Sequence, residues 1–170
     1  MGKKVNLPLL DDREGEPKKK AKKPSIDVAR TRLGGRTSAD EVAPQGLAPG
    51  VIVSFALASG RRRPAVVVYA GPSEVHVLLD GIRLRRLPPS ELSLHEGAAP
   101  DDLTKLAADA RLFGLLSEGE SVRYADDSGS LVDGKLVEKC RWGALVLRDD
   151  GAVVAVGFRK LWPTPTTPST

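Results

Sequence analysis

Apolar and polar residues alternate along two long stretches of the chain, and this pattern predicts β-strands. The first stretch begins near Pro49 and contains the runs VIVSFAL, AVVVYA, EVHVLLD and IRLRRL. The second begins near Glu118 and contains SVRYAD, GKLVEKC, ALVLRD and AVVAVGF. Short runs of this kind, bounded by Gly, Ser and Asp, are typical of antiparallel strands joined by tight turns. We therefore predict two small β-rich units, at residues 46–97 and 118–163.

Between the two stretches the apolar period lengthens to three or four residues, which predicts a helix within residues 98–117. The apolar residues that would share one helical face are Leu103, Leu106, Ala107, Ala110 and Phe113. Asp101 or Asp102 is placed to cap the helix, and both suit its positive N-terminal end. This helix would link the two units.

The two ends of the chain lack such patterns. Residues 1–45 have no sustained apolar period and contain the run EPKKKAKKP, so we predict a disordered basic leader. Within it, residues 25–33 are predicted to form one or two helical turns that begin at Ser25 and stop at Gly34. Alone they are too short to persist and would order on a partner. Residues 164–170 are a Pro/Thr tail, also predicted to be disordered.

The two β-rich stretches resemble each other at an offset of 69 residues. Aligned pairs include Gly50 with Gly119, Ser59 with Ser128, Val77 with Val146 and Asp80 with Asp149. A one-residue slip at the Asp-Gly turn keeps the later strands in register. Because the turn residues coincide as well as the apolar ones, we interpret the pattern as a tandem repeat of one β-unit.

Each unit has five short strands, a tight hairpin between the third and fourth, and a 3₁₀-like turn before the last. This order resembles the SH3-like small barrels, a superfold that includes the Tudor, agenet and KOW types. The resemblance covers residues 46–97 and 118–163 and concerns strand and turn order alone. It implies a mostly-β fold with two tandem five-stranded barrels that bind peptides, modified side chains or nucleic acid at one rim. The fold does not choose among these ligands.

The net charge of +4 is distributed unevenly. Residues 1–45 hold 11 Lys and Arg against 7 Asp and Glu, whereas the other 125 residues hold 15 of each. The basic candidates for nucleic-acid binding are Lys18, Lys19, Lys20, Lys22 and Lys23 in the leader, and Arg61, Arg62, Arg63, Arg83 and Arg85 in the first unit. Such clusters suit phosphates. Solvated turn and edge-strand charge is the alternative reading.

Aromatic residues concentrate in the second unit. Tyr124 lies near its first turn and Trp142 lies within a turn, so both are candidates for a rim that binds a partner. Packing in the core or between the barrels is the alternative for these rings.

Catalytic and metal-binding signatures are lacking. The sequence contains no GxGxxG, GxxxxGK[ST], HExxH, GxSxG or CxxC motif. His76 alternates with two valines and is expected on the outer face of a strand. Cys140 lies beside basic residues that would lower its pKa, although a buried strand-end Cys is commoner. We predict no enzyme, cofactor or metal.

The leading hypothesis is a non-catalytic adaptor that contacts nucleic acid or a ribonucleoprotein through its basic leader and the first barrel. The alternative is an assembly module that binds a partner peptide at the aromatic rim of the second barrel. A single Cys and the absence of a long apolar segment predict a cytoplasmic protein that does not enter membranes. The oligomeric state and the choice between DNA, RNA and protein stay open.

Overall fold

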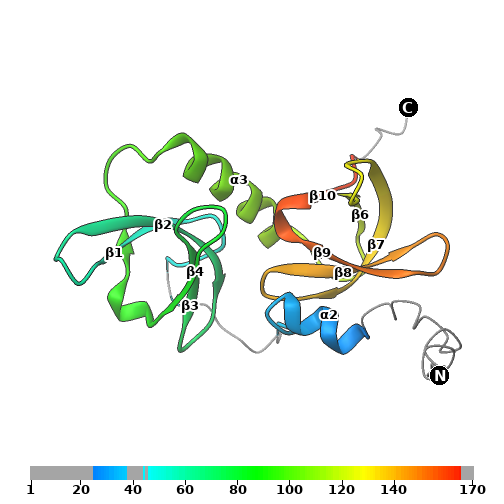
Figure 1. Cartoon of the computed structure of the whole chain (residues 1–170), viewed down its shortest axis with the longest axis horizontal. Coiled ribbons are helices and arrows are strands. Elements are labelled where there is room, and N and C mark those ends of the chain that lie inside the picture. The colour runs from blue at the N-terminus through cyan, green and yellow to red at the C-terminus, as the bar shows by residue number, and fades with distance from the viewer. Residues whose placement is uncertain (1–24, 38–43, 45, 166–170) are drawn as a thin grey trace, which may run out of the picture.

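Two antiparallel five-stranded sheets lie at opposite ends of the molecule, with a helix between them (Figure 1). This computed structural model describes residues 25–37, 44 and 46–165. The mostly-β class predicted from the sequence is confirmed. None of the helices in the described ranges is long and apolar enough to cross a membrane.

The first unit has the strand order β4-β3-β2-β1-β5. Its strands are β1 (Ile52–Ala56), β2 (Arg62–Ala70), β3 (Val75–Leu78), β4 (Leu84–Leu87) and β5 (Ser93–Leu94). A 3₁₀ turn, η1 (Pro89–Glu91), precedes the last strand. Among the described residues, no β-ladder joins β4 to β5. Hydrogen bonds therefore do not close this sheet into a barrel.

The second unit has the equivalent order, β9-β8-β7-β6-β10. Its strands are β6 (Ser121–Ala125), β7 (Leu131–Lys139), β8 (Gly143–Arg148), β9 (Val153–Gly157) and β10 (Leu161–Pro163). The turn η2 (Phe158–Lys160) again precedes the last strand. β9 pairs with β8 alone, so one of its edges has no strand partner within the described part of the chain.

Local irregularities recur in both units at the offset of 69 residues. A bulge lies between Val67 and Tyr69 in β2 and between Leu136 and Glu138 in β7. The third hairpin closes with a backbone bond from Leu79 to Arg83 in one unit and from Arg148 to Ala152 in the other. These loops have equal length, so the slip expected at the Asp-Gly turn does not occur.

Helix α3 (Asp101–Leu115) has the predicted apolar face. Its N-cap, however, is Pro100, and no side chain caps it, so the expected aspartate cap is wrong. Both aspartates lie within the first turn, where they still favour the positive helix end. At the other end, Lys139 Nζ donates to the carbonyls of Gly114 and Leu116, at 3.2 and 2.8 Å. This contact ties α3 to β7.

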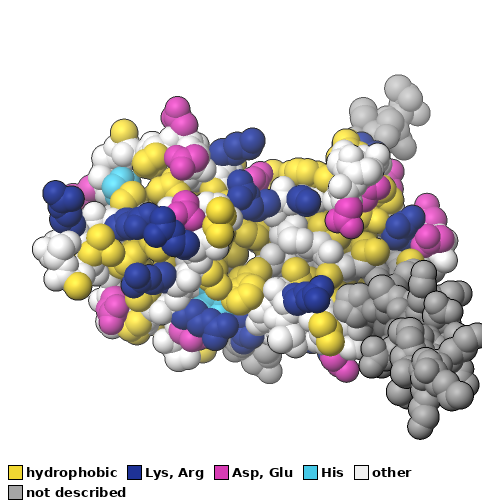
Figure 2. Space-filling view, in the orientation of Figure 1, with side chains coloured by type: hydrophobic (Ala, Val, Ile, Leu, Met, Phe, Trp, Pro, Cys, Tyr) yellow, Lys and Arg dark blue, Asp and Glu magenta, His cyan; other side chains and the backbone are white. Residues whose placement is uncertain are grey.

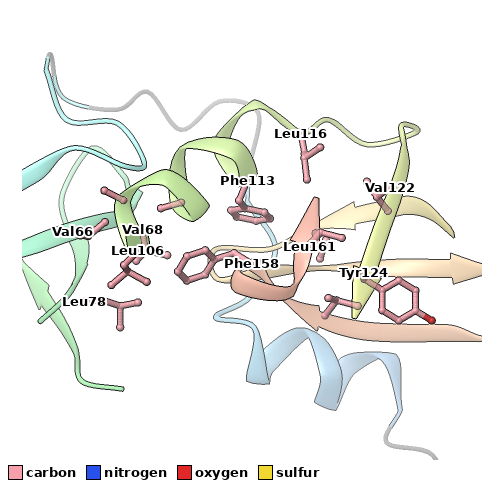
Figure 3. Packing of buried hydrophobic residues seen from close by; sticks show 14 of the residues in the cluster. Val66, Val68, Leu78, Leu106, Phe113, Leu116, Val122, Tyr124, Phe158 and Leu161 are labelled. Atoms are coloured by element: carbon pink, nitrogen blue, oxygen red, sulfur yellow. The ribbon is translucent and has the colours of Figure 1, made fainter. Parts of the chain in front are cut away.

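One hydrophobic cluster unites both units through α3 (Figure 3). It joins Val66, Val68 and Leu78 of the first unit to Phe113 of α3 and to Phe158 of the second unit. The first unit also encloses a separate core on its inner face, formed by residues such as Val53, Phe55 and Val77. The outer face of the first sheet is therefore covered by the rest of the protein.

A second helix lies within the leader that was predicted to be disordered, and it corrects that prediction for residues 26–32. Helix α2 (Ile26–Arg32) begins at the predicted N-cap, where Ser25 Oγ accepts from Val28 N–H at 3.3 Å. Ala29 and Leu33 pack on Cys140 and Leu145 of the second unit. The partner that orders this short helix is thus the same chain. The predicted disorder of residues 1–24 and 166–170 lies outside the described residues.

Candidate functional site

The arginines of the first unit fall on two faces of its sheet. Two residues that lie directly opposite each other on neighbouring strands point to the same face of the sheet. Arg63 is paired with Phe55 and Arg85 with Val77, and both apolar partners belong to the inner core. Arg63 and Arg85 therefore reach toward the same end of that core, where the Arg85 guanidinium lies 5.9 Å from the Phe55 ring centroid.

Arg61 and Arg62 come from the turn between β1 and β2. Leu57 N–H bonds to Arg61 C=O at 2.7 Å and closes this turn, which leaves Arg61 exposed at its tip. The Arg62 guanidinium donates to Ser54 C=O at 3.0 Å and to the Ser93 hydroxyl. Arg62 consequently links β5 to β1. The Arg61 side chain makes no such link among the described residues.

Among the described residues, Arg83 is the one candidate arginine that has a carboxylate partner. Its Nε lies 3.0 Å from Asp80 Oδ2. Asp80 also accepts the backbone N–H groups of Arg83 and Ile82, and these bonds hold the pKa of its carboxyl below its usual range. The charge of Arg83 is therefore largely neutralised by the turn that it belongs to.

Lys and Arg side chains gather across the first unit in Figure 2, over β4 and the β1–β2 turn. Of the described residues, no carboxylate lies within ion-pair distance of Arg61, Arg62, Arg63, Arg85 or Arg86. The candidate lysines, Lys18 to Lys23, lie outside the described residues. The predicted basic set is thus brought together only in part, by the first unit.

Two arginines of the second unit, Arg123 and Arg148, pair with carboxylates, whereas Arg159 donates to Gly81 C=O. Arg123 lies 2.7 Å from Asp133, and Arg148 lies 3.2 Å from Asp150. Arg30 of α2 binds the nearly buried Glu138 with two hydrogen bonds, at 2.6 and 3.0 Å. The Arg30 guanidinium lowers the pKa of the Glu138 carboxyl. Among the described residues, the first unit therefore has more arginines without a carboxylate partner than the second unit has.

The two aromatic candidates of the second unit are largely packed inside the protein. Tyr124 is 3 % exposed and belongs to the shared cluster. Trp142 is half-buried between the units, and its indole ring packs on Gly34. Its Nε1–H donates to Nδ1 of His76 at 2.9 Å. These positions match the packing alternative. Both residues also line one groove, so their role in binding a partner stays a prediction.

Sequence reasoning missed His76, which lies where the two units meet. We call this contact the junction; it comprises His76, Trp142, Arg86 and Arg141. His76 does lie on the outer face of its strand, but that face is covered, and the residue is only 1 % exposed. Because Nδ1 accepts from Trp142, the neutral ring carries its proton on Nε2, which donates to Glu74 Oε1 at 2.9 Å. Burial lowers the pKa of His76, and this effect exceeds the opposing effect of Glu74.

Two basic groups complete this junction. Arg86, opposite His76 on β4, places its guanidinium 5.8 Å from the Trp142 ring centroid. Arg141 places its guanidinium 4.9 Å from the Tyr69 ring and donates to Gly34 C=O. Arg86 was not among the predicted site residues. Its contact with Trp142 forms only in the folded chain, so the sequence alone does not show it.

Cys140, Asp126 and Asp150 have structural roles. Burial raises the pKa of the Cys140 thiol to about 11, so the predicted lowering by its basic neighbours is wrong. Asp126 accepts from Ser128 and Ser130 within its turn, and Asp150 accepts from Ala152 N–H. No group of three His, Cys, Asp or Glu residues suited to a metal occurs in the described part of the chain.

Comparison with known proteins assigns the chain to no family. No protein-family model matches the chain, and no curated protein matches it in sequence.

Proposed function

We propose that the chain is a non-catalytic adaptor built from two SH3-like units, and that the first unit binds nucleic acid through its arginines. One observation carries this proposal: the first unit holds five arginines without a carboxylate in ion-pair distance among the described residues, while Arg123, Arg148 and Arg30 are each paired. Unneutralised guanidinium groups on one small unit are suited to the phosphates of a nucleic-acid backbone.

Arg61, Arg63 and Arg85 form the centre of the proposed surface. Arg62 is engaged with Ser54 and Ser93, and Arg86 faces Trp142, so these two border it. Contacts of this kind position a backbone and carry little sequence information. We therefore expect binding of RNA and DNA with weak sequence preference and a strong dependence on salt.

The test measures fluorescence anisotropy of a labelled 20-nucleotide RNA and a 20-base-pair DNA duplex at about 50 and about 200 mM salt. The double variant Arg61→Ala/Arg85→Ala of the full chain is compared with the charge-matched Arg123→Ala/Arg148→Ala. We expect the first to weaken DNA binding about tenfold or more at low salt and to reduce the slope of log K against log salt by about 1.8. The control should change affinity less than about threefold, because its arginines are paired.

The basic leader is tested separately by replacing Lys18, Lys19, Lys20, Lys22 and Lys23 with Ser in the full chain. An additional loss of affinity is expected if the leader contributes phosphate contacts. Binding that depends on these lysines and is indifferent to Arg61→Ala/Arg85→Ala would contradict the proposed surface on the first unit.

A further inference from the structure

A groove of about 490 Å³ runs along the unpaired edge of β9. One wall is β9 itself, and the other includes Tyr124 and the β6–β7 turn at Asp126 and Asp127. Its volume lies within the range of sites that hold ligands in proteins. None of the arginines proposed to bind nucleic acid lines this groove.

The backbone of β9 presents unpaired hydrogen-bonding groups to the groove. Phe158 N–H bonds to Trp142 C=O, and Arg148 N–H bonds to Ala152 C=O, which fixes the alternation along this antiparallel pair. Residues 154 and 156 therefore face β8, whereas Ala155 and Gly157 direct their N–H and C=O groups away from it. Within the described residues, no strand pairs with that edge.

A buried side-chain group in the groove wall also lacks a partner. Tyr124 is 3 % exposed, and its hydroxyl has no hydrogen-bond partner in the described part of the chain. Figure 3 shows this oxygen pointing away from the labelled core residues. A buried hydroxyl without a partner is costly, and a ligand with a polar group in the groove would satisfy it.

We infer that β9 is a docking edge for an extended segment of a partner protein, which adds to the sheet as a further strand. Alternating donors and acceptors at strand spacing match a peptide backbone, so the main chain of the partner would bond to Ala155 and Gly157. Asp126 and Asp127 line the groove together with Arg159 and Lys160, and Arg148 is paired with Asp150. This mixed charge suits a phosphate backbone less well than the arginines of the first unit do.

The side chains of the partner segment follow from the groove lining. Val154 offers apolar surface on one face of β9, whereas Val156 and Phe158 line the groove but are each only 5 % exposed. Charges of both signs border the groove, with Asp127 and Lys160 among them. The fitting segment therefore alternates apolar and polar residues and has a low net charge. This inference goes beyond the proposed function and concerns the other unit.

The test selects a phage-displayed library of random 12-residue linear peptides on the full chain. Enriched peptides are then measured against Ala155→Pro and Ala155→Val. Proline removes the outward N–H of residue 155 without removing a bond to β8, and valine retains that N–H. We expect at least a tenfold loss of affinity in Ala155→Pro, less than a threefold change in Ala155→Val, and little effect of salt.

Hydrogen exchange provides a readout that needs no variant. Peptide binding to the unmodified chain should slow exchange at the amides of Ala155 and Gly157, and leave those of Val154 and Val156 unchanged. The absence of enriched peptides, equal binding by Ala155→Pro, or protection located elsewhere would overturn the inference. So would a dimer in light scattering that Ala155→Pro converts to a monomer, because a second copy would then occupy the edge.

Discussion

The two units share a strand order, a bulge and a set of turns, yet they differ in what covers them. The first unit encloses its own core and also gives its outer face, through Val66, Val68 and Leu78, to the shared cluster. The second unit uses its inner face for that cluster, and α2 covers part of its outer face. Equal turns and strands therefore coexist with different surfaces. Among the described residues, the first unit has five arginines without a carboxylate partner, and the second has a groove beside the edge of β9.

The largest expected effect concerns the cluster that joins the units. Phe113→Ala should lower the free energy of unfolding by about 3–5 kcal/mol, because Phe113 is buried between both sheets and its removal leaves a cavity. Urea denaturation followed by tryptophan fluorescence measures this loss. Leu112→Ala on the same helix is the control, since Leu112 is exposed, and should cost less than about 1 kcal/mol.

The same experiment distinguishes one cooperative body from two independent ones. If the shared cluster couples the units, circular dichroism and tryptophan fluorescence give coincident transitions in the unmodified chain. Two separate transitions, of which Phe113→Ala shifts only one, would show that the units unfold independently.

An intermediate effect is expected from pH at the junction. The pKa of His76 is lowered in the folded protein, so the unfolded chain binds more protons as the pH falls below about 6.5. Stability contributed by neutral His76 is complete above this value and declines below it, by at most about 1.4 kcal/mol per pH unit. Glu74 opposes this decline, whereas Arg86 and Arg141 reinforce it. Denaturation of the chain and of His76→Gln between pH 5 and 7 measures the difference.

His76→Gln should flatten the pH dependence over this range, since glutamine does not titrate. Equal slopes in both proteins would show that His76 is not protonated on unfolding. That result would contradict the buried, neutral ring described for the junction.

The smallest effect is expected at the buried hydroxyl of Tyr124, and Trp142 provides the contrast. Tyr124→Phe removes a hydroxyl that has no partner among the described residues, so stability should be unchanged or rise by up to about 1 kcal/mol. Trp142→Phe, in contrast, removes the donor to His76 and should lower stability by about 1–3 kcal/mol. Thermal denaturation compares them, and a clear loss in Tyr124→Phe would indicate a partner for the hydroxyl.

Sequence reasoning succeeded where the determinants are local. Glycines at turns and the alternation of apolar residues predict the strands, and a period of three to four residues predicts α3. The class is confirmed at that level, whereas the SH3-like assignment stays an interpretation. Alternation cannot tell a solvated face from one covered by another unit, and so the burial of His76 was not foreseen.

The errors in the candidate sites have the same origin. Trp142 and His76 are 66 residues apart, and Arg30 and Glu138 are 108 apart, so no local pattern reports these contacts. The short helix α2 depends on such contacts for its stability, since its length alone is insufficient. A possible signal was the pair Ala29 and Leu33, an apolar stripe on a segment otherwise rich in charge.

The docking of α2 on the second unit also fixes an order of events during synthesis. Arg30 leaves the ribosome 108 residues before Glu138. At about 5–20 residues per second, that interval lasts roughly 5–20 s. The last strand of the first unit ends at Leu94, so this unit has all of its strands before Glu138 is made, while α2 still lacks the surface on which it packs. Attachment of α2 therefore follows synthesis of the first unit, and it closes a loop of chain that contains the first unit.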